Sequence, residues 1–464
     1  MSLNEIHIKS SSKGEKINDE IYKPNMITGI IQINNNDNKQ KRIINSYENS
    51  RKEKSKSISK DKIGNEKEIK NCEIYINDKK IKFDYYYNFP KEGNYTIKYI
   101  FKEILTSASH IFFNCQSLIS LDLSNFNSEF IVNMKHMFEG CTSLKSLTLT
   151  KFYTRKVTNM KYIFKECESL LSLDLSSFNT ENVISMENMF YNCKKIEHFD
   201  LSKFNTQKLK DTSCMFFGCS SLVSLDLSNF NTEQVTNMCG MFYGCTSLIS
   251  LDLSSFNTSK VSNMAIMFEN CNKLINLNVS NFNTSKVINM KSMFHKCESL
   301  ISLNLSNFKT EKLFNTSSMF SKCKSLISLD ISNFSTQNVC DMSSMFLNCK
   351  CLTLMNLSHF NTENVESMDK MFCNCNSLLS LDISNFNTKK VIDMKNMFKN
   401  CYSLIYLNLD LSKFIIYKTF FYEDTLLCNC NSLFYKYTLN FDMMLKNRDK
   451  SKKKKKKNKN KNKK

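Results

Sequence analysis

The chain is poor in the residues that most often break regular structure, with eight glycines and two prolines among 464 residues. It must therefore turn mainly on Asn, Ser, Thr and Asp. Three functional signatures are also lacking: G-x-x-x-x-G-K-[ST], G-x-G-x-x-G and H-E-x-x-H. These absences predict a protein that is not an enzyme and that holds no cofactor. The six histidines are scattered, and none recurs in a pattern: His7, His110, His136, His198, His295 and His359.

Long apolar runs are lacking as well. No stretch of about 18 apolar residues occurs, which is the length that predicts a transmembrane helix. The first residues, MSLNEIHIKSSSKGEKINDE, carry charges where a secretory signal peptide has its apolar core. The sequence therefore predicts no membrane span and no signal peptide, and by this criterion an intracellular protein.

The chain does contain a repeat of 26 residues, whose frame reads C-x-S-L-x-S-L-D-L-S-x-F-N-T-x-x-V-x-N-M-x-x-M-F-x-x. Self-similarity at a fixed period of about 20 to 50 residues is typical of stacked structural units. Such units form one elongated body, in which each coil contacts only its neighbours. The cysteines that mark the frame are Cys115, Cys141, Cys167, Cys193, Cys219, Cys245, Cys271, Cys297, Cys323, Cys349, Cys375 and Cys401.

The composition divides the chain into five parts. The N-terminal part is rich in Lys, Asn and Ser, which predicts disorder. After it, the segments EIYI, KIKFDYY and YTIKYIF predict a β-rich cap on the first coil. Most of the net charge of +20 lies in the two ends of the chain. The predicted boundaries are 1–71 for the disordered region, 72–107 for the N-terminal cap, 108–413 for twelve repeats, 414–445 for the C-terminal cap and 446–464 for a poly-Lys tail.

One coil illustrates the predicted local structure. Leu251 and Leu253 alternate with polar residues, and this period of two predicts a short parallel strand with its leucines inward. From Met264 to Cys271, apolar residues recur at i, i+3, i+4 and i+7, which predicts a short helix. Asn263 precedes that segment and is of a good N-cap type. Its equivalents are Asn133, Asn159, Ser185, Asp211, Asn237, Asn289, Asn315, Asp341, Ser367 and Asp393.

The frame resembles a known family. L-x-x-L-x-L followed by a turn and a second apolar segment is similar to a leucine-rich repeat. The fuller frame, M-F-x-x-C-x-S-L-x-x-L-D-L-S-x-F-x-T-x-x-V-x-N-M, resembles the BspA-like branch, which includes repeats of mycoplasma and other bacterial surface lipoproteins and of some protist surface proteins. The resemblance implies a curved, right-handed α/β solenoid with an adhesion or interaction role. The sequence departs from the common leucine-rich type at Phe256 and its equivalents, where that type has Asn or Cys.

The regular cysteines have two interpretations. Each closes the apolar stripe of its coil as a small buried hydrophobe, or neighbouring sulfurs lie close enough for disulfides if the protein is exported. One cysteine per coil is not a zinc-binding C-x-x-C pair, and each C-x-C pair supplies only half of a zinc site. We therefore expect buried cysteines and no metal. The C-x-C pairs are Cys349/Cys351, Cys373/Cys375 and Cys428/Cys430.

One position of the strands is acidic in seven coils and Asn or Thr in the others. Because adjacent strands lie about 4.8 Å apart, consecutive aspartates form a row of like charges. Either water and the flanking serines solvate this row, or it lines a polar groove for a basic or hydroxyl-rich partner or a cation. The second interpretation makes the concave face the candidate binding site. The column consists of Asp122, Asp174, Asp200, Asp226, Asp252, Asp330 and Asp382.

The basic tail offers a second candidate site. It suits a nuclear localisation signal or a nonspecific polyanion contact, and equally a solvated tail without a function. The leading hypothesis is a non-enzymatic scaffold or adhesin that binds a protein or glycan partner through the concave face. The family resemblance implies a location at the cell surface. The alternative is a nuclear or nucleic-acid-associated protein that uses the tail. The tail lysines in question are Lys452, Lys453, Lys454, Lys455, Lys456 and Lys457.

Overall fold

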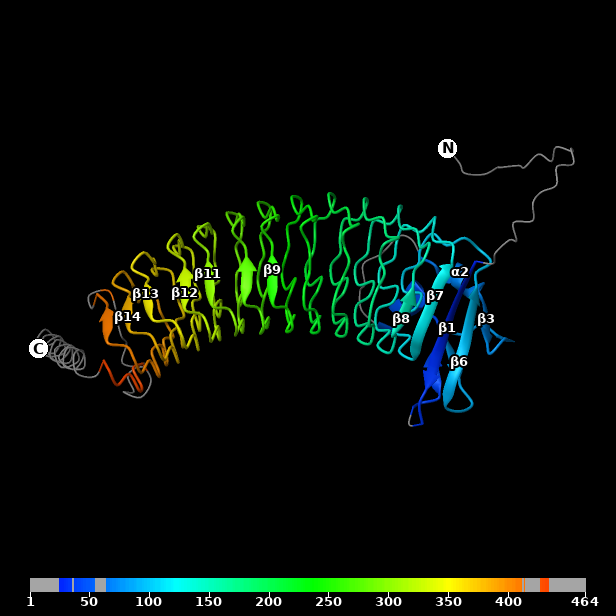
Figure 1. The fold of residues 1–464 in the computed structure, drawn as a ribbon, viewed down its shortest axis with the longest axis horizontal. Coiled ribbons are helices and arrows are strands. Elements are labelled where there is room, and N and C mark those ends of the chain that lie inside the picture. Colours follow the sequence, from blue (N-terminus) through cyan, green and yellow to red (C-terminus); the bar gives the residue numbers. More distant parts are fainter. Residues whose placement is uncertain (1–24, 36, 55–63, 411–412, 414–425, 434–464) are drawn as a thin grey trace, which may run out of the picture.

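The structure, a computed structural model, describes residues 25–35, 37–54, 64–410, 413 and 426–433. Its coils stack into a long arched solenoid with a β-sheet at the N-terminal end (Figure 1). Its elements are β1 (Met26–Ile33), β2 (Gln40–Arg42), α1 (Tyr47–Lys54), α2 (Glu66–Lys70), β3 (Glu73–Ile76), β4 (Lys79–Ile81), β5 (Tyr86–Asn88), β6 (Gly93–Ile100), β7 (Leu118–Asn125), β8 (Ser146–Thr148), β9 (Ser250–Asp252), β10 (Asn276–Asn278), β11 (Ser302–Asn304), β12 (Ser328–Asp330), β13 (Leu354–Asn356), β14 (Ser380–Asp382) and β15 (Tyr406–Asn408).

Short parallel strands stack along one side of the solenoid. In β9 and β10, Ser250 pairs with Asn276, so residues 26 apart lie side by side. The same register joins β11 to β12 and β13 to β14 and β15. Leu251 is buried between the exposed Ser250 and Asp252, which confirms the predicted alternation. The coils between β8 and β9 carry no regular strand, but their leucines, such as Leu225, are buried in the same way.

The segment predicted as a helix in each coil forms a run of turns instead. The N–H of Met267 donates to the carbonyl oxygen of Met264 at 3.4 Å, which closes a turn. The next N–H, of Phe268, donates at 2.9 Å to Met293 in the following coil. Ile266 has a φ of 53°, which a right-handed helix does not accommodate. The predicted apolar residues are all buried, but the helices of the described part, α1 and α2, both precede the first coil.

Stacking explains why turns replace the helix. Every second N–H of this segment donates to the next coil, so it is not free to bond four residues back along its own coil. The turns from Met264 to Met267 and from Phe268 to Cys271 leave the same apolar spacing as a helix face. The hydrophobic period therefore identified the buried side chains correctly and the backbone wrongly.

The polar residue predicted as a helix N-cap starts this run of turns. The side-chain oxygen of Asn263 accepts a hydrogen bond from the N–H of Ala265 at 3.1 Å, the geometry of an Asx-turn. Asn263 also forms parallel bridges with Asn237 and Asn289. Such bridges continue from Ser107 to Asp393, and they make a second ladder on the side of the coils opposite the strands.

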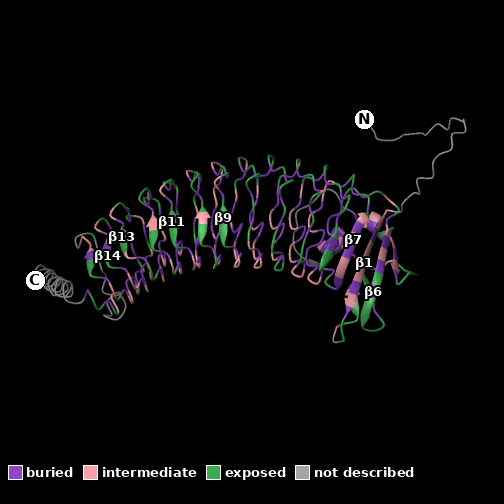
Figure 2. Cartoon of the chain, viewed as in Figure 1, coloured by how far each residue is buried: buried purple, intermediate pink, exposed green. Residues whose placement is uncertain are grey.

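Columns of equivalent buried side chains fill the space between the two ladders. Figure 2 shows that stretches of buried residues recur from coil to coil. The ring of Phe268 stacks on that of Phe242 with centroids 5.6 Å apart and an interplanar angle of 4°. The thiol of Cys271 is buried and donates to the carbonyl oxygen of Phe242 at 3.1 Å. All twenty cysteines are free thiols, so those of the ladder act as buried hydrophobes that also satisfy a backbone carbonyl.

A six-stranded sheet closes the N-terminal end of the solenoid, in the order β4-β3-β6-β1-β7-β8. Strand β1 pairs antiparallel with β6 and with β7, the strand of the first coil. The prediction of disorder over 1–71 is therefore wrong for residues 26–33, and also for 40–42, 47–54 and 66–70, which form β2, α1 and α2. Ile27, Ile31 and Ile33 are buried, but the Lys/Asn-rich residues around them hid this short apolar pattern. The edge of the first strand is thereby paired instead of exposed.

Two buried asparagines complete the second ladder at the same end. In the first coil, the carbonyl oxygens that have no preceding coil to bond are those of Ser107, Ser109, Ile111 and Phe113. The Asn65 side chain donates to the first two at 3.2 and 2.8 Å. The Asn45 backbone donates to the third at 2.7 Å, and its side chain donates to the fourth at 3.2 Å. The first coil thus keeps its buried acceptors satisfied.

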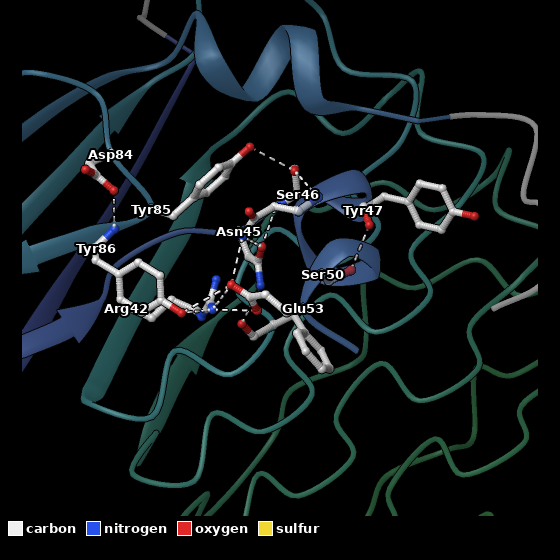
Figure 3. A network of polar contacts seen from close by, with 11 residues as sticks. Arg42, Asn45, Ser46, Tyr47, Ser50, Glu53, Asp84, Tyr85 and Tyr86 are labelled. Atoms are coloured by element: carbon white, nitrogen blue, oxygen red, sulfur yellow. Dashed lines mark hydrogen bonds and ion pairs between the residues drawn. The ribbon is translucent and has the colours of Figure 1, made fainter. Parts of the chain in front are cut away.

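A polar network surrounds Asn45 (Figure 3). The guanidinium of Arg42 bonds both carboxylate oxygens of Glu53 at 2.6 and 2.7 Å and lies over the ring of Tyr86. The Asn45 side chain also accepts from the N–H of Ser46 at 2.8 Å. This network ties β2 and β5 to α1, so α1 is fixed against the first coil.

The C-terminal end is described only in part. Of the predicted cap, 414–445, only residues 426–433 are described, and the tail, 446–464, lies outside the described residues. Within 426–433 the ladder continues despite the longer spacing. The N–H of Asn400 donates to Cys428 at 2.8 Å, and the thiol of Cys430 donates to Phe398 at 2.8 Å.

We expect replacement of Asn65 by Leu to destabilise the N-terminal end. The change leaves two buried carbonyl oxygens without donors, at a cost of about 1–3 kcal/mol each. The free energy of unfolding in urea measures this loss, and hydrogen exchange should show it in the first coils. The control is Asn71→Leu, the same change at an exposed asparagine nearby. Equal losses in the two variants would contradict the capping role.

We expect the ladder thiols to resist alkylation in the folded protein. Burial raises the pKa of Cys271 to about 12, so its reactive thiolate is scarce at a pH of about 8. Cys351 is exposed and should react with iodoacetamide first. Mass spectrometry of labelled peptides measures both rates, and all cysteines should react in denaturant. Equal rates in the folded protein would disprove the buried ladder.

Candidate interaction surface

The strands of the repeats present the most regular surface of the molecule. Their outward side chains form a surface that we call the strand face, which Figure 2 shows as largely exposed along β9, β11 and β13. Figure 1 shows these strands on a broad side of the solenoid, and the arch bends within the plane of that side. The strand face is therefore not the inner edge of the arch, where the prediction of a concave site placed the Asp column.

Each aspartate of the predicted column stabilises a turn in its own coil. Its Oδ1 atom accepts a hydrogen bond from the N–H of the serine two residues later, at 2.9 to 3.1 Å. For Asp252, the N–H and hydroxyl of Ser254 hold the pKa of the carboxyl below its usual value. The carboxylate of Asp252 is thus ionised at neutral pH, and all seven side chains are ordered by their own backbone.

Asparagine performs the same turn role in other coils. The side-chain oxygen of Asn304 accepts from the N–H of Ser306 at 2.9 Å, and that of Asn356 accepts from Ser358 at 3.0 Å. The position therefore requires an acceptor oxygen to form the turn, whereas the turn does not require a negative charge. Both interpretations of the column stay open, because a structural turn does not exclude a partner that contacts the charge.

A stripe of isoleucines runs beside the Asp column and was not recognised in the sequence. Four residues after the frame cysteine, Ile249, Ile275, Ile301 and Ile327 lie on consecutive coils and are 45%, 40%, 47% and 58% exposed. We call these four residues the aliphatic stripe. The N–H of Ile275 donates to Ile249 and that of Ile327 donates to Ile301, both at 2.8 Å, so the side chains lie side by side. Exposed apolar residues at the same or nearby positions of other coils are Leu171, Leu354, Leu379, Tyr402, Ile405 and Tyr406.

The frame contained a signal for this stripe. In C-x-S-L-x-S-L, the second x is Ile in six coils and Leu in two, although it lies next to a buried leucine and just outside the strand. An apolar residue that recurs at a position without a place in the core predicts an exposed column. The frame writes this position as x, a variable residue, and so does not show the column.

The remaining sequence predictions concern a metal site, a membrane span and the basic tail. In the part of the chain that the structure describes, no cluster of three or more His, Cys, Asp or Glu could hold a metal ion. Neither α1 nor α2 has the length and apolarity that crossing a membrane requires. The tail lysines, Lys452 to Lys457, lie outside the described residues.

These features define the chain as a β-solenoid repeat protein, with two ladders of backbone hydrogen bonds around columns of identical side chains. Its repeats match a family model described as "Mycoplasma protein of unknown function, DUF285", over residues 106–225, 210–329 and 317–436. The overlapping matches span most of the chain, which therefore belongs to this family. No curated protein matches the chain in sequence.

Two solved structures of leucine-rich-repeat type are among those similar to the chain. One, a leucine-rich-repeat protein of Leptospira interrogans, is 15% identical with a TM-score of 0.26, and the match covers 66% of this chain and 82% of that one. The other, the TLR13–ssRNA13 complex, is 16% identical with a TM-score of 0.16, and the match covers 65% of this chain and 60% of that one.

We expect Asp252→Asn to leave the thermal midpoint almost unchanged and Asp252→Ala to lower it. Asparagine keeps the acceptor for Ser254, as Asn304 does for Ser306, whereas alanine removes it. Folding lowers the pKa of the Asp252 carboxyl. The small difference in thermal midpoint between the wild type and Asp252→Asn is therefore present above the unfolded pKa, about 3.9. It is lost as pH falls through the folded pKa. Thermal unfolding between pH of about 2 and 7 checks this. Equal midpoints for the Ala and Asn variants would contradict the turn role.

Proposed function

We propose that the chain is a scaffold that binds a protein partner through the strand face. The observation that carries this proposal is the aliphatic stripe, four isoleucines that lie side by side on an otherwise polar surface. Contiguous exposed apolar residues rimmed by polar ones are typical of protein-binding sites. The fold explains how the stripe forms, since any exposed residue type that recurs in the frame becomes a continuous column.

The composition of the stripe favours a protein over a glycan. Isoleucine offers no hydrogen-bond donor or acceptor to a sugar hydroxyl, whereas it buries well against aliphatic or aromatic side chains. The serines and aspartates beside the stripe would form the polar rim of such an interface. The seven aspartates of the column are thus proposed as rim residues, with the stripe at the centre.

The resemblance to BspA-like repeats and to surface lipoproteins adds an adhesion role at the cell surface to this proposal. The description of the matching family names Mycoplasma, which is compatible with an adhesion role. A regular elongated face suits adhesion because many coils present the same chemistry. Protease treatment of intact cells checks the location. Cleavage supports the surface role, whereas protection restricts the scaffold to the inside of the cell.

A photocrosslinking amino acid at Ile275 should capture a protein partner in cells that express the full chain. The same amino acid at Lys286, which is exposed outside the strand face, should capture far less of it. Ile301→Ser should reduce crosslinking at Ile275, because it interrupts the stripe without touching the core. Capture that is equal at both positions, or that survives the serine variant, would refute the strand face as the binding site.

A further inference from the structure

We propose that the partner presents an amphipathic α-helix that lies along the aliphatic stripe and places two basic residues over the acidic ends of the adjacent column. This inference rests on the proposed function and specifies the chemistry of the partner. It follows from two periodicities, one of the isoleucines and one of the charges.

The spacing of the coils matches a helix better than an extended strand. Strands β9 and β10 pair in parallel, as do β11 and β12, and the bridge between Asn289 and Asn315 stacks the two middle coils. Because adjacent parallel strands lie about 4.8 Å apart, we take that distance as the rise of the isoleucines from coil to coil. A helix advances about 5.4 Å per turn, whereas side chains on one face of an extended strand repeat at about 6.6 Å. Over the three intervals of the stripe a helix drifts by only about 2 Å, so one turn meets each isoleucine.

The charges beside the stripe have a specific order. On the four coils that carry the isoleucines, the adjacent column reads Asp252, Asn278, Asn304 and Asp330. The negative charges therefore lie at the two ends of the stripe, with neutral amides between them. The serines that follow Asp252 and Asp330 keep the pKa of both carboxyls lowered, so both are ionised.

This order predicts the position of the basic residues in the partner. Three coil intervals span about 14 Å, which corresponds to about ten residues of helix at 1.5 Å per residue. A Lys or Arg at each end of that interval, on the flank of the apolar face, would pair with Asp252 and Asp330. Basic residues between them would meet only the amides of Asn278 and Asn304.

A second copy of this chain fits the strand face less well. A two-fold axis along the strands would set the Asp columns of the two copies against each other. A two-fold axis along the solenoid would set Asp252 opposite Thr246 and Asp330 opposite Lys324. Lys324 already pairs with Glu298 in its own chain at 2.8 Å. Charge complementarity therefore favours a different, basic partner over self-association.

The test uses the full chain and two synthetic helical peptides with the same leucine face. One carries lysines ten residues apart on its flank and the other carries glutamates there. We expect fluorescence anisotropy to show binding of the Lys peptide at least tenfold tighter than that of the Glu peptide. Added salt should weaken only the Lys peptide.

Two double variants separate the apolar and charged contributions. Ile275→Ser with Ile301→Ser should weaken binding of the Lys peptide at least tenfold. Asp252→Asn with Asp330→Asn should weaken it about three- to tenfold and reduce its salt dependence. The Asn changes keep the turns, as Asn278 and Asn304 do naturally, so a weaker complex reflects charge. Circular dichroism confirms that each variant is folded.

The following results would overturn the inference. Equal binding of the two peptides, or unchanged binding by the Asn variant, would remove the charge argument. A dimer that sedimentation detects in the wild type but not in the Ser variant would assign the stripe to a second copy. If the crosslinking at Ile275 captures a partner without such a helix, the inference fails and the proposed function stands. If nothing is captured there, both fail.

Discussion

The structure depends on the backbone hydrogen bonds between residues that are 26 positions apart. A strand of three residues, such as β9, is too short to be stable alone, and a single coil cannot bury its leucines and methionines. Stacking solves both problems, because each coil supplies the hydrogen-bond partners and the apolar cover of the next. Every side chain then has its own equivalents as neighbours, which is why one residue type at one position becomes a column.

Polar residues enter the core under the same constraint. Thr206 is buried, and its hydroxyl accepts from the N–H of Asn231 at 2.7 Å and donates to the carbonyl oxygen of the same residue at 3.1 Å. A buried polar group is costly without partners, and here the following coil provides both. The ladder thiols are satisfied similarly, although they bond to the preceding coil. The first coil lacks a preceding neighbour, so Asn45 and Asn65 replace the donors that a further coil would supply.

The repeat, the strand register and the buried residues were predictable because period and burial are written directly in the frame. The helix was not, since Met264, Met267, Phe268 and Cys271 have the same spacing on a helix and on a run of turns. Only the hydrogen bonds to the next coil decide between them. Strand β1 was missed because its three buried isoleucines lie within a composition that predicts disorder. For the candidate site, the Asp column was visible, but its turn role depends on a serine contact that spacing does not show.

The N-terminal end of the solenoid is built differently from its repeats, so the number of repeats can change without changing that end. Strand β1 and the two asparagines bond the first coil, and the later coils as far as Asp393 bond neighbours that resemble themselves. Duplication or loss of one 26-residue unit would leave every ladder intact and every column in register. A gene for such a chain could thus extend or shorten its outer surface in fixed steps while the fold and its closed end stay the same.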